Sequence, residues 1–179
     1  MAPRKKYQTR TFRISEEYDN ILQEEAEKRG ISTNNLVERI LKKFTQNDRY
    51  YNETQILSIA PTTMANILET MSNNEVAQAG RKAGSIKAKE NLLIRGMSLN
   101  YSSVKWFIQE IMANSAGWFV CNYSRRDDMN TFYIRHSLGQ KWSIFLIAYL
   151  DAMIETILNA KATITDLKGS IILKIPPEP

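Results

Sequence analysis

The chain has 179 residues, 43% of them hydrophobic and 24% charged, with a formal net charge of +5 at neutral pH. This balance is typical of a folded protein rather than a disordered one, and the length suits one large domain or two small ones. The single cysteine, Cys121, excludes an intramolecular disulfide and favours a reducing compartment. The longest apolar run, residues 144–150, is far shorter than the roughly 20 residues that span a bilayer. We therefore expect a cytoplasmic protein without a membrane partner. The basic start of the chain does not have the pattern of a secretory signal.

Positive charge is concentrated at the start of the chain. Residues 1–14 contain no acid and these cations: Arg4, Lys5, Lys6, Arg10 and Arg13. The following stretch, residues 16–27, is strongly acidic. The basic end is therefore the part expected to meet the phosphates of a nucleic acid.

The first fifty residues predict a strand followed by two helices. Residues 7–14 alternate and are rich in threonine and aromatic side chains, which is typical of a short strand. Ser15 is placed to cap a first helix, and Gly30 is placed to end it. Ser32 is placed to cap a second helix with an apolar stripe, and the polar stretch 47–52 is interpreted as a linker.

A unit of about 50 residues is near the limit for independent folding, so pairing with a second copy is expected. Two strands would pair into an antiparallel ribbon above four helices. Phe12 and Ile14 would then face the helices, and Thr9, Thr11 and Arg13 would lie on the opposite side, where a two-stranded ribbon fits the major groove.

These residues carry a resemblance to a known family. The stretch Thr9-Arg10-Thr11-Phe12-Arg13-Ile14-Ser15, the break at Gly30-Ile31-Ser32 and the apolar stretch from Leu36 to Leu41 resemble the ribbon-helix-helix family of the Arc and MetJ repressors. The resemblance covers roughly residues 5–50. It implies an intertwined homodimer that reads double-stranded DNA with its ribbon.

The resemblance also implies roles for particular residues. The base readers would be Thr9, Thr11 and Arg13. The backbone N–H groups of Ser32, Thr33 and Asn34, at the start of the second helix, would each help to anchor a phosphate. Sequence-independent attraction to phosphates would come from the nearby cations Arg4, Lys5, Lys6 and Arg10.

The remainder, residues 55–179, predicts a second α+β domain. The expected elements are a strand at 55–60, helices at about 61–71, 75–95 and 98–111, strands at 117–123 and 131–135, a long helix to Leu158, and a strand or hairpin at 163–175. Ser137-Leu138-Gly139-Gln140 has the spacing of a capping box at the start of the long helix. Apart from the extra helices, this order is ferredoxin-like.

Several roles remain open for the second domain. Its plan is similar to that of nickel-responsive repressors, but one histidine, His136, and one cysteine are too few for a nickel or zinc site, so no metal or other cofactor is expected. His136 is interpreted as structural. A small-molecule effector pocket is one expectation, and tetramer formation is another. The candidate pocket walls are aromatic: Trp106, Trp118, Phe132, Tyr133, Trp142 and Tyr149.

No enzyme motif is present: the sequence has no phosphate-binding loop, nucleophile elbow or His-Glu-x-x-His metal motif. We therefore expect a non-enzymatic protein with a ribbon-helix-helix module at 1–50 and an oligomerisation or effector domain at 55–179. The expected function is sequence-specific transcriptional regulation, as a repressor associated with the nucleoid. Two alternatives remain: an antitoxin-like protein that binds another protein, and a non-specific nucleoid or plasmid-partition DNA binder.

Overall fold

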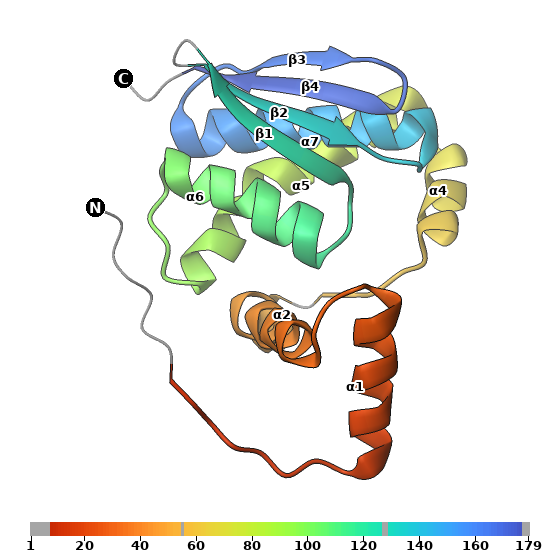
Figure 1. Cartoon of the computed structure of the whole chain (residues 1–179). Helices are drawn as coiled ribbons and strands as arrows, with labels where there is room; N and C mark the ends of the chain where they lie inside the picture. The colour runs from red at the N-terminus through yellow and green to blue at the C-terminus, as the bar shows by residue number, and fades with distance from the viewer. Residues whose placement is uncertain (1–7, 55, 127–128, 177–179) are drawn as a thin grey trace. The chain divides into compact units, whose positions relative to one another are not determined.

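The computed structural model describes residues 8–54, 56–126 and 129–176 (Figure 1). It is a mixed α+β protein that divides into two compact units, one up to Gln46 and one from Asn47 onward. Each unit is described by itself. Among the described residues, no helix combines the length and hydropathy that a bilayer crossing requires.

The first unit contains two helices, α1 (Glu16–Lys28) and α2 (Thr33–Gln46). The Oγ of Ser15 accepts a hydrogen bond from the backbone N–H of Tyr18 at 3.4 Å, as the cap predicted at the start of the first helix requires. Gly30 follows α1 with φ +62°, the left-handed conformation that favours glycine at a helix end. The Oγ of Ser32 accepts from the N–H of Asn35 at 3.2 Å. Both predicted helices and both predicted caps are confirmed.

The strand predicted at residues 7–14 is not present in the single chain. Residues 8–14 are exposed and form neither strand nor helix, while Tyr7 lies outside the described residues. A strand exists only through hydrogen bonds to a neighbouring strand, and the described residues of one copy provide no such neighbour for this segment. The first unit, taken alone, is therefore helical rather than β-α-α.

The second unit begins with residues that were expected to form a linker. After Asn47, they form a short 3-10 helix (Asp48–Tyr50) and α3 (Tyr51–Thr54). The side chain of Asn47 is buried, and its Oδ1 accepts a hydrogen bond from Nη2 of Arg95 at 3.2 Å. The guanidinium of Arg95 also lies 4.6 Å from the ring centroid of Tyr50. These contacts attach residues 47–50 to the end of a long helix.

That long helix is α5 (Asn73–Ile94), which follows α4 (Pro61–Glu69). A capping box starts α5: the Ser72 side chain accepts from the N–H of Glu75, and the Glu75 carboxylate accepts from the N–H of Ser72. Then come α6 (Tyr101–Trp106), continued by a π-helix (Phe107–Ser115), and finally α7 (Gly139–Leu158). A Cβ atom on Gly80 or Gly84 would lie within 2.4 Å of a backbone carbonyl oxygen of α7, so the two glycines allow α5 to pack closely against α7.

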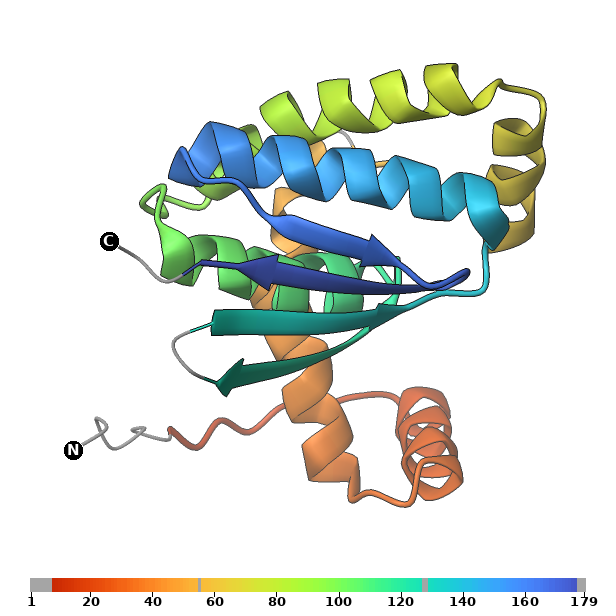
Figure 2. The same ribbon diagram turned by 90° about the horizontal axis from the view of Figure 1, so that it is seen from above.

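The strands form one antiparallel sheet in the order β1-β2-β4-β3. They are β1 (Val120–Arg126), β2 (Met129–Arg135), β3 (Thr163–Asp166) and β4 (Ser170–Ile175). Figures 1 and 2 show α6 and α7 against one face of this sheet. The core lies between these layers and includes the fully buried Phe132, Leu146 and Leu173.

The ferredoxin-like arrangement is wrong. The described residues of the first predicted strand, 56–60, are exposed and form no strand, and all four strands come after residue 119. The run Ile56-Leu57-Ser58-Ile59 is apolar enough for a strand, but Pro61 starts α4 directly after it and no described strand lies beside it. The paired strands predicted near 117–135 and 163–175 are confirmed.

The capping box predicted at Ser137 is also wrong. The residue preceding α7 is Leu138, which makes no side-chain cap. Gly139 has φ +80°, and the Gln140 side chain donates to Asp166 at 2.7 Å instead of turning back to the helix start. The glycine conformation changes the chain direction here and takes Ser137 out of cap position.

Candidate nucleic-acid interface

The residues predicted to read bases lie together in the segment before α1. Thr9, Thr11 and Arg13 are all exposed. Arg13 makes no ion pair with a carboxylate of the described residues. Arg10 is exposed too, and its Nη2 donates to the Oε1 of Gln8 at 3.1 Å. Arg4, Lys5 and Lys6 lie outside the described residues. The segment is thus a polar, basic strip with hydrogen-bonding groups open to solvent.

The start of α2 provides donors for an anion. Ser32 uses its Oγ as a cap for Asn35, which leaves the N–H groups of Thr33 and Asn34 in the first turn, where a helix has no internal acceptors. The first turn of α2 contains no acid. The first turn of α1, in contrast, contains Glu16, Glu17 and Asp19. The helix dipole therefore favours an anion at α2, whereas the acids at α1 already satisfy its N-terminus.

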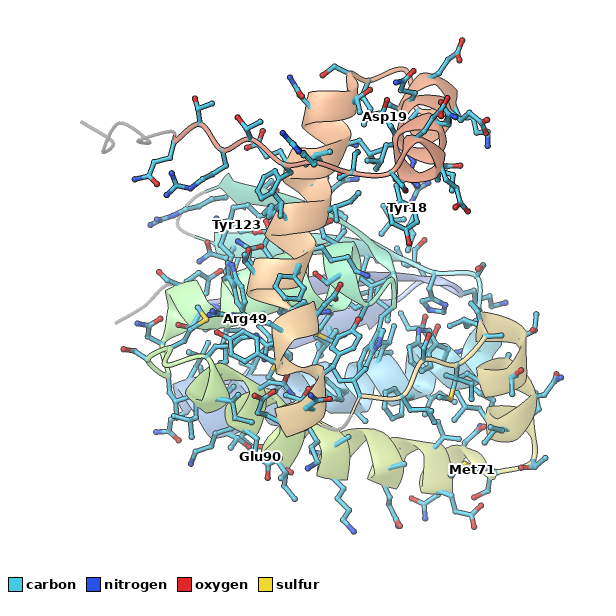
Figure 3. The ribbon with its side chains drawn as sticks, turned by 90° about the horizontal axis from the view of Figure 1, so that it is seen from below. Tyr18, Asp19, Arg49, Met71, Glu90 and Tyr123 are labelled. Carbon is cyan, nitrogen blue, oxygen red and sulfur yellow. The ribbon has the colours of Figure 1, made fainter. Side chains whose placement is uncertain are left out.

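The first unit exposes much of its apolar surface. Among its apolar residues, Ala26 and Leu36 are buried. Phe12 is 70% exposed and Tyr18, shown on α1 in Figure 3, is 61% exposed. The larger set, called here the apolar surface of the first unit, has exposed side chains from the N-terminal segment and both helices: Phe12, Ile14, Tyr18, Ile21, Ile40, Leu41 and Phe44.

The aromatic residues suggested as walls of an effector pocket mostly fill the core. Phe132, Trp142 and Tyr149 are buried. The rings of Trp118 and Trp142 pack edge to face with centroids 5.5 Å apart, and the Trp142 indole N–H donates to the Trp118 carbonyl at 3.2 Å. Tyr133 differs, because it points away from the core and is 46% exposed.

His136 is held between β2 and α7. Its Nε2 lies 2.9 Å from the Oγ of the buried Ser143, and its backbone N–H donates to the Gly169 carbonyl at 3.1 Å. Burial lowers its pKa below the ordinary histidine value, and the charge of Asp166 raises that pKa only in part. Among the described residues, no cluster of three histidine, cysteine or acidic side chains is arranged to hold a metal ion.

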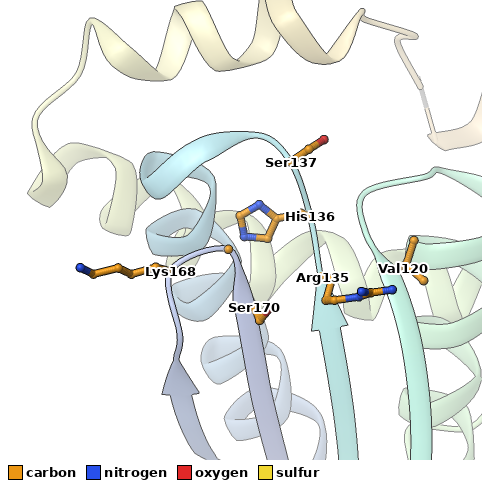
Figure 4. A pocket seen from close by; sticks show the side chains of 7 residues that line it. Val120, Arg135, His136, Ser137, Lys168 and Ser170 are labelled. Atoms are coloured by element: carbon orange, nitrogen blue, oxygen red, sulfur yellow. The ribbon is translucent and has the colours of Figure 1, made fainter.

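Sequence reasoning missed a hollow beside His136 (Figure 4). It is lined by the ends of β1, β2 and β4, the β3–β4 turn and the residue before Leu138: Val120, Arg135, His136, Ser137, Lys168, Gly169 and Ser170. The consecutive residues Arg135, His136 and Ser137 were the part of its lining that a local sequence pattern could have indicated. The rest of the wall comes from residues far away along the chain, which only the sheet brings together.

Comparison with known proteins does not assign the chain to a family. No protein-family model matches the chain, and no curated protein matches it significantly.

Proposed function

We propose that the chain is a sequence-specific DNA-binding transcriptional regulator that acts as a homodimer, with a ribbon-helix-helix module in its first fifty residues. The observation that carries this proposal is the apolar surface of the first unit. A solvated segment and two short helices do not retain seven large exposed apolar side chains without a partner surface. Complete burial of each such side chain stabilises an assembly by roughly 1.5–3 kcal/mol.

A second copy is the partner that also accounts for residues 8–14. Two antiparallel copies of this segment supply each other with the strand hydrogen bonds that one chain lacks. Strand alternation then turns Phe12 and Ile14 to the helices, and it turns Thr9, Thr11 and Arg13 to the outside.

The outer face of this ribbon has the chemistry of a DNA reader. An arginine bonds bidentately to O6 and N7 of guanine, and a threonine presents a hydroxyl and a methyl group to a base pair. Each good bidentate contact discriminates by about 1–3 kcal/mol. Arg10 adds attraction to phosphates, as do Lys5 and Lys6 beyond the described residues, and the free N–H groups of Thr33 and Asn34 suit one phosphate on each side.

Repression by occupation of an operator is the simplest activity for such a protein, and it implies association with the nucleoid. A tetramer formed through the second unit would let two dimers bind adjacent operator sites. A protein-binding role of the antitoxin kind and non-specific DNA binding are the competing functions, and the following experiment separates them.

The experiment is selection of bound sequences from a random duplex pool by the full-length protein, with Arg13→Ala in parallel. We expect the wild type to enrich a symmetric motif and Arg13→Ala to lose or relax it. The matched control is Arg29→Ala, which removes an exposed arginine of the same unit that pairs with Glu25 at 3.1 Å. Steep salt dependence without a motif means non-specific binding, and no duplex binding at all overturns the proposal.

The dimer is tested separately by sedimentation equilibrium. Phe44→Glu puts a charge into the apolar surface of the first unit and is expected to weaken association at least tenfold. Glu38→Gln on the exposed side of α2 is its control. A wild type that stays monomeric at 100 times the concentration needed for DNA binding contradicts the ribbon.

A further inference from the structure

The sheet of the second unit has one face that no described helix of the same unit covers (Figures 1 and 2). Strand alternation directs Phe132 and Ile134 of β2 into the core and Tyr133 and Arg135 to the other face. The register extends this open face across the sheet: Tyr133 is paired with Asn122 on one side and Ile172 on the other. The open face thus carries an exposed aromatic ring at its middle and an arginine at one end.

The hollow lies at that same end. It has a volume of about 430 Å³ and is largely open to solvent, and Val120, Arg135 and Ser170 of the open face form part of its wall. Small-molecule sites commonly enclose about 300–1,000 Å³. The space is therefore adequate for a small ligand that continues over the open face.

The wall of the hollow is basic. It contains Arg135 and Lys168 and no acid, and neither cation pairs with a carboxylate of the described residues. Asp166, just before this turn, already accepts from Gln140 at 2.7 Å and from the backbone N–H of Lys168 at 3.1 Å. The Lys168 side chain extends away from the hollow in Figure 4, and being exposed it can turn toward a bound anion.

Two further groups in the wall suit an anion. The hydroxyls of Ser137 and Ser170 have no hydrogen-bond partner among the described residues and can donate to a ligand oxygen. Ser137 also lies just before the N-terminus of α7, where Leu138 provides no side-chain cap for the free N–H groups. A helix of 20 residues favours negative charge at this end. The anion-binding groups in the wall itself are therefore the two cations and the two hydroxyls, while the start of α7 lies next to Ser137 without lining the hollow.

Tyr133 adds a second element of recognition. It lies two residues before Arg135 on the same strand, so the two side chains start about 7 Å apart on one face. A half-exposed tyrosine ring on the open face of a sheet is a surface on which another planar ring stacks. An anion bound at the hollow therefore has room for an attached ring over Tyr133.

We propose that the hollow and Tyr133 form a site for a mononucleotide, whose phosphate contacts Arg135 and Lys168 and whose base stacks on Tyr133. Among the described side chains of the open face, Tyr133 is the only aromatic one, which suits one base rather than a succession of bases. The ligand acts as an effector of the regulator. This last clause rests on the proposed function, whereas binding itself does not.

The test is isothermal titration of the full-length protein with AMP, GMP, CMP and UMP, and with adenosine and inorganic phosphate. We expect saturable binding of at least one nucleotide, with Arg135→Ala weakening it at least tenfold. Tyr133→Ala should weaken the nucleotide and leave inorganic phosphate unchanged. Tyr133→Phe should restore binding, and circular dichroism of each variant checks that it is folded.

Lys174→Ala is the matched control. Lys174 is exposed on the same open face and pairs with Thr131, which lies two residues from Tyr133 on β2. The substitution therefore removes an equal charge outside the hollow. It should leave nucleotide affinity unchanged. No saturable binding of any of the four nucleotides, or wild-type affinity in Arg135→Ala, overturns the site.

Two other outcomes also overturn the proposal. Equal affinity for inorganic phosphate and for nucleotide would show that the base makes no contact with Tyr133. Tighter binding of oligothymidylate than of any mononucleotide, weakened by Lys174→Ala, assigns the face to single-stranded nucleic acid instead. Repeating the titration with Arg13→Ala separates the two proposals. This variant is expected to lose duplex recognition but to bind the nucleotide with wild-type affinity.

Discussion

A Cβ atom on Gly84 would lie 2.1 Å from the carbonyl oxygen of Tyr149, so the backbone of α5 passes against the backbone of α7 with no room for a side chain. Gly80 repeats this relationship one turn earlier, at 2.4 Å from the carbonyl oxygen of Phe145. Both obstacles are backbone atoms of a helix, which cannot move aside as a flexible side chain can.

Gly84→Ala is therefore expected to destabilise the protein. Alanine gains about 1 kcal/mol over glycine in helix propensity, but separating two packed helices costs about 1–3 kcal/mol or more. Because the obstacle at 2.1 Å is backbone, we expect the cost to lie at the upper end, which gives a net loss of about 2 kcal/mol in the free energy of unfolding, measured by urea denaturation. Lys89→Ala, on the exposed side of α5, should change it by less than about 0.5 kcal/mol. A Gly84→Ala protein as stable as the wild type would show that the helices are farther apart.

Arg95→Lys is expected to release residues 47–54 from the rest of the second unit. Lysine keeps the charge but loses the planar group that bonds Asn47 and lies over the Tyr50 ring. We expect a loss of about 1–2 kcal/mol and faster amide exchange in residues 47–54. The control, Arg81→Lys, alters an exposed pair with Asp151 and should leave that exchange unchanged. Unaltered exchange in Arg95→Lys would contradict the attachment.

His136 is expected to make stability sensitive to acid. Burial lowers its pKa in the folded protein, so the unfolded chain binds the proton more readily. Its contribution is present above the ordinary pKa of about 6.5 and is lost as the pH falls through the lower folded value. The difference in unfolding free energy between wild type and His136→Gln should therefore shrink between pH 7.5 and pH 5. A constant difference would mean that His136 does not titrate in this range.

Cys121 is expected to react slowly with alkylating reagents. Burial raises the pKa of its thiol to about 11, which leaves far less thiolate at pH 8 than a free cysteine has. We expect iodoacetamide to modify the folded protein at least tenfold more slowly than the same protein in urea, as followed by mass spectrometry. The raised pKa also means that this thiol's contribution to stability is lost as the pH rises toward 11. Equal rates in the two states would show that the thiol is accessible and ordinary.

The sequence predicted best those features that depend on neighbouring residues. Ser15, Gly30 and Ser32 determine the ends of α1 and α2 through local hydrogen bonds and backbone conformation, and these ends were predicted correctly. The paired strands near 117–135 were likewise predicted from local patterns, but Phe132, which enters the core, was not separated there from Tyr133, which does not.

Features that depend on distant partners were not predictable in the same way. Residues 56–60 have an apolar pattern that fits a strand, but pattern alone does not provide a neighbouring strand. The same dependence explains why residues 8–14 form no strand in one copy. The hollow was missed because Arg135 and Lys168 come from opposite sides of α7 in the sequence and meet only through the pairing of β2 with β4.

The position of β4 has a consequence for how the protein is made. It is the last of the described strands in sequence order, yet it lies inside the sheet between β2 and β3. During synthesis β1, β2 and α7 leave the ribosome before the strand that joins β2 to β3 exists, so the sheet cannot close until residues 170–175 have been made. Premature termination after α7 would therefore produce a chain with an unfilled interior, which is a substrate for chaperones and proteases rather than a shorter folded protein.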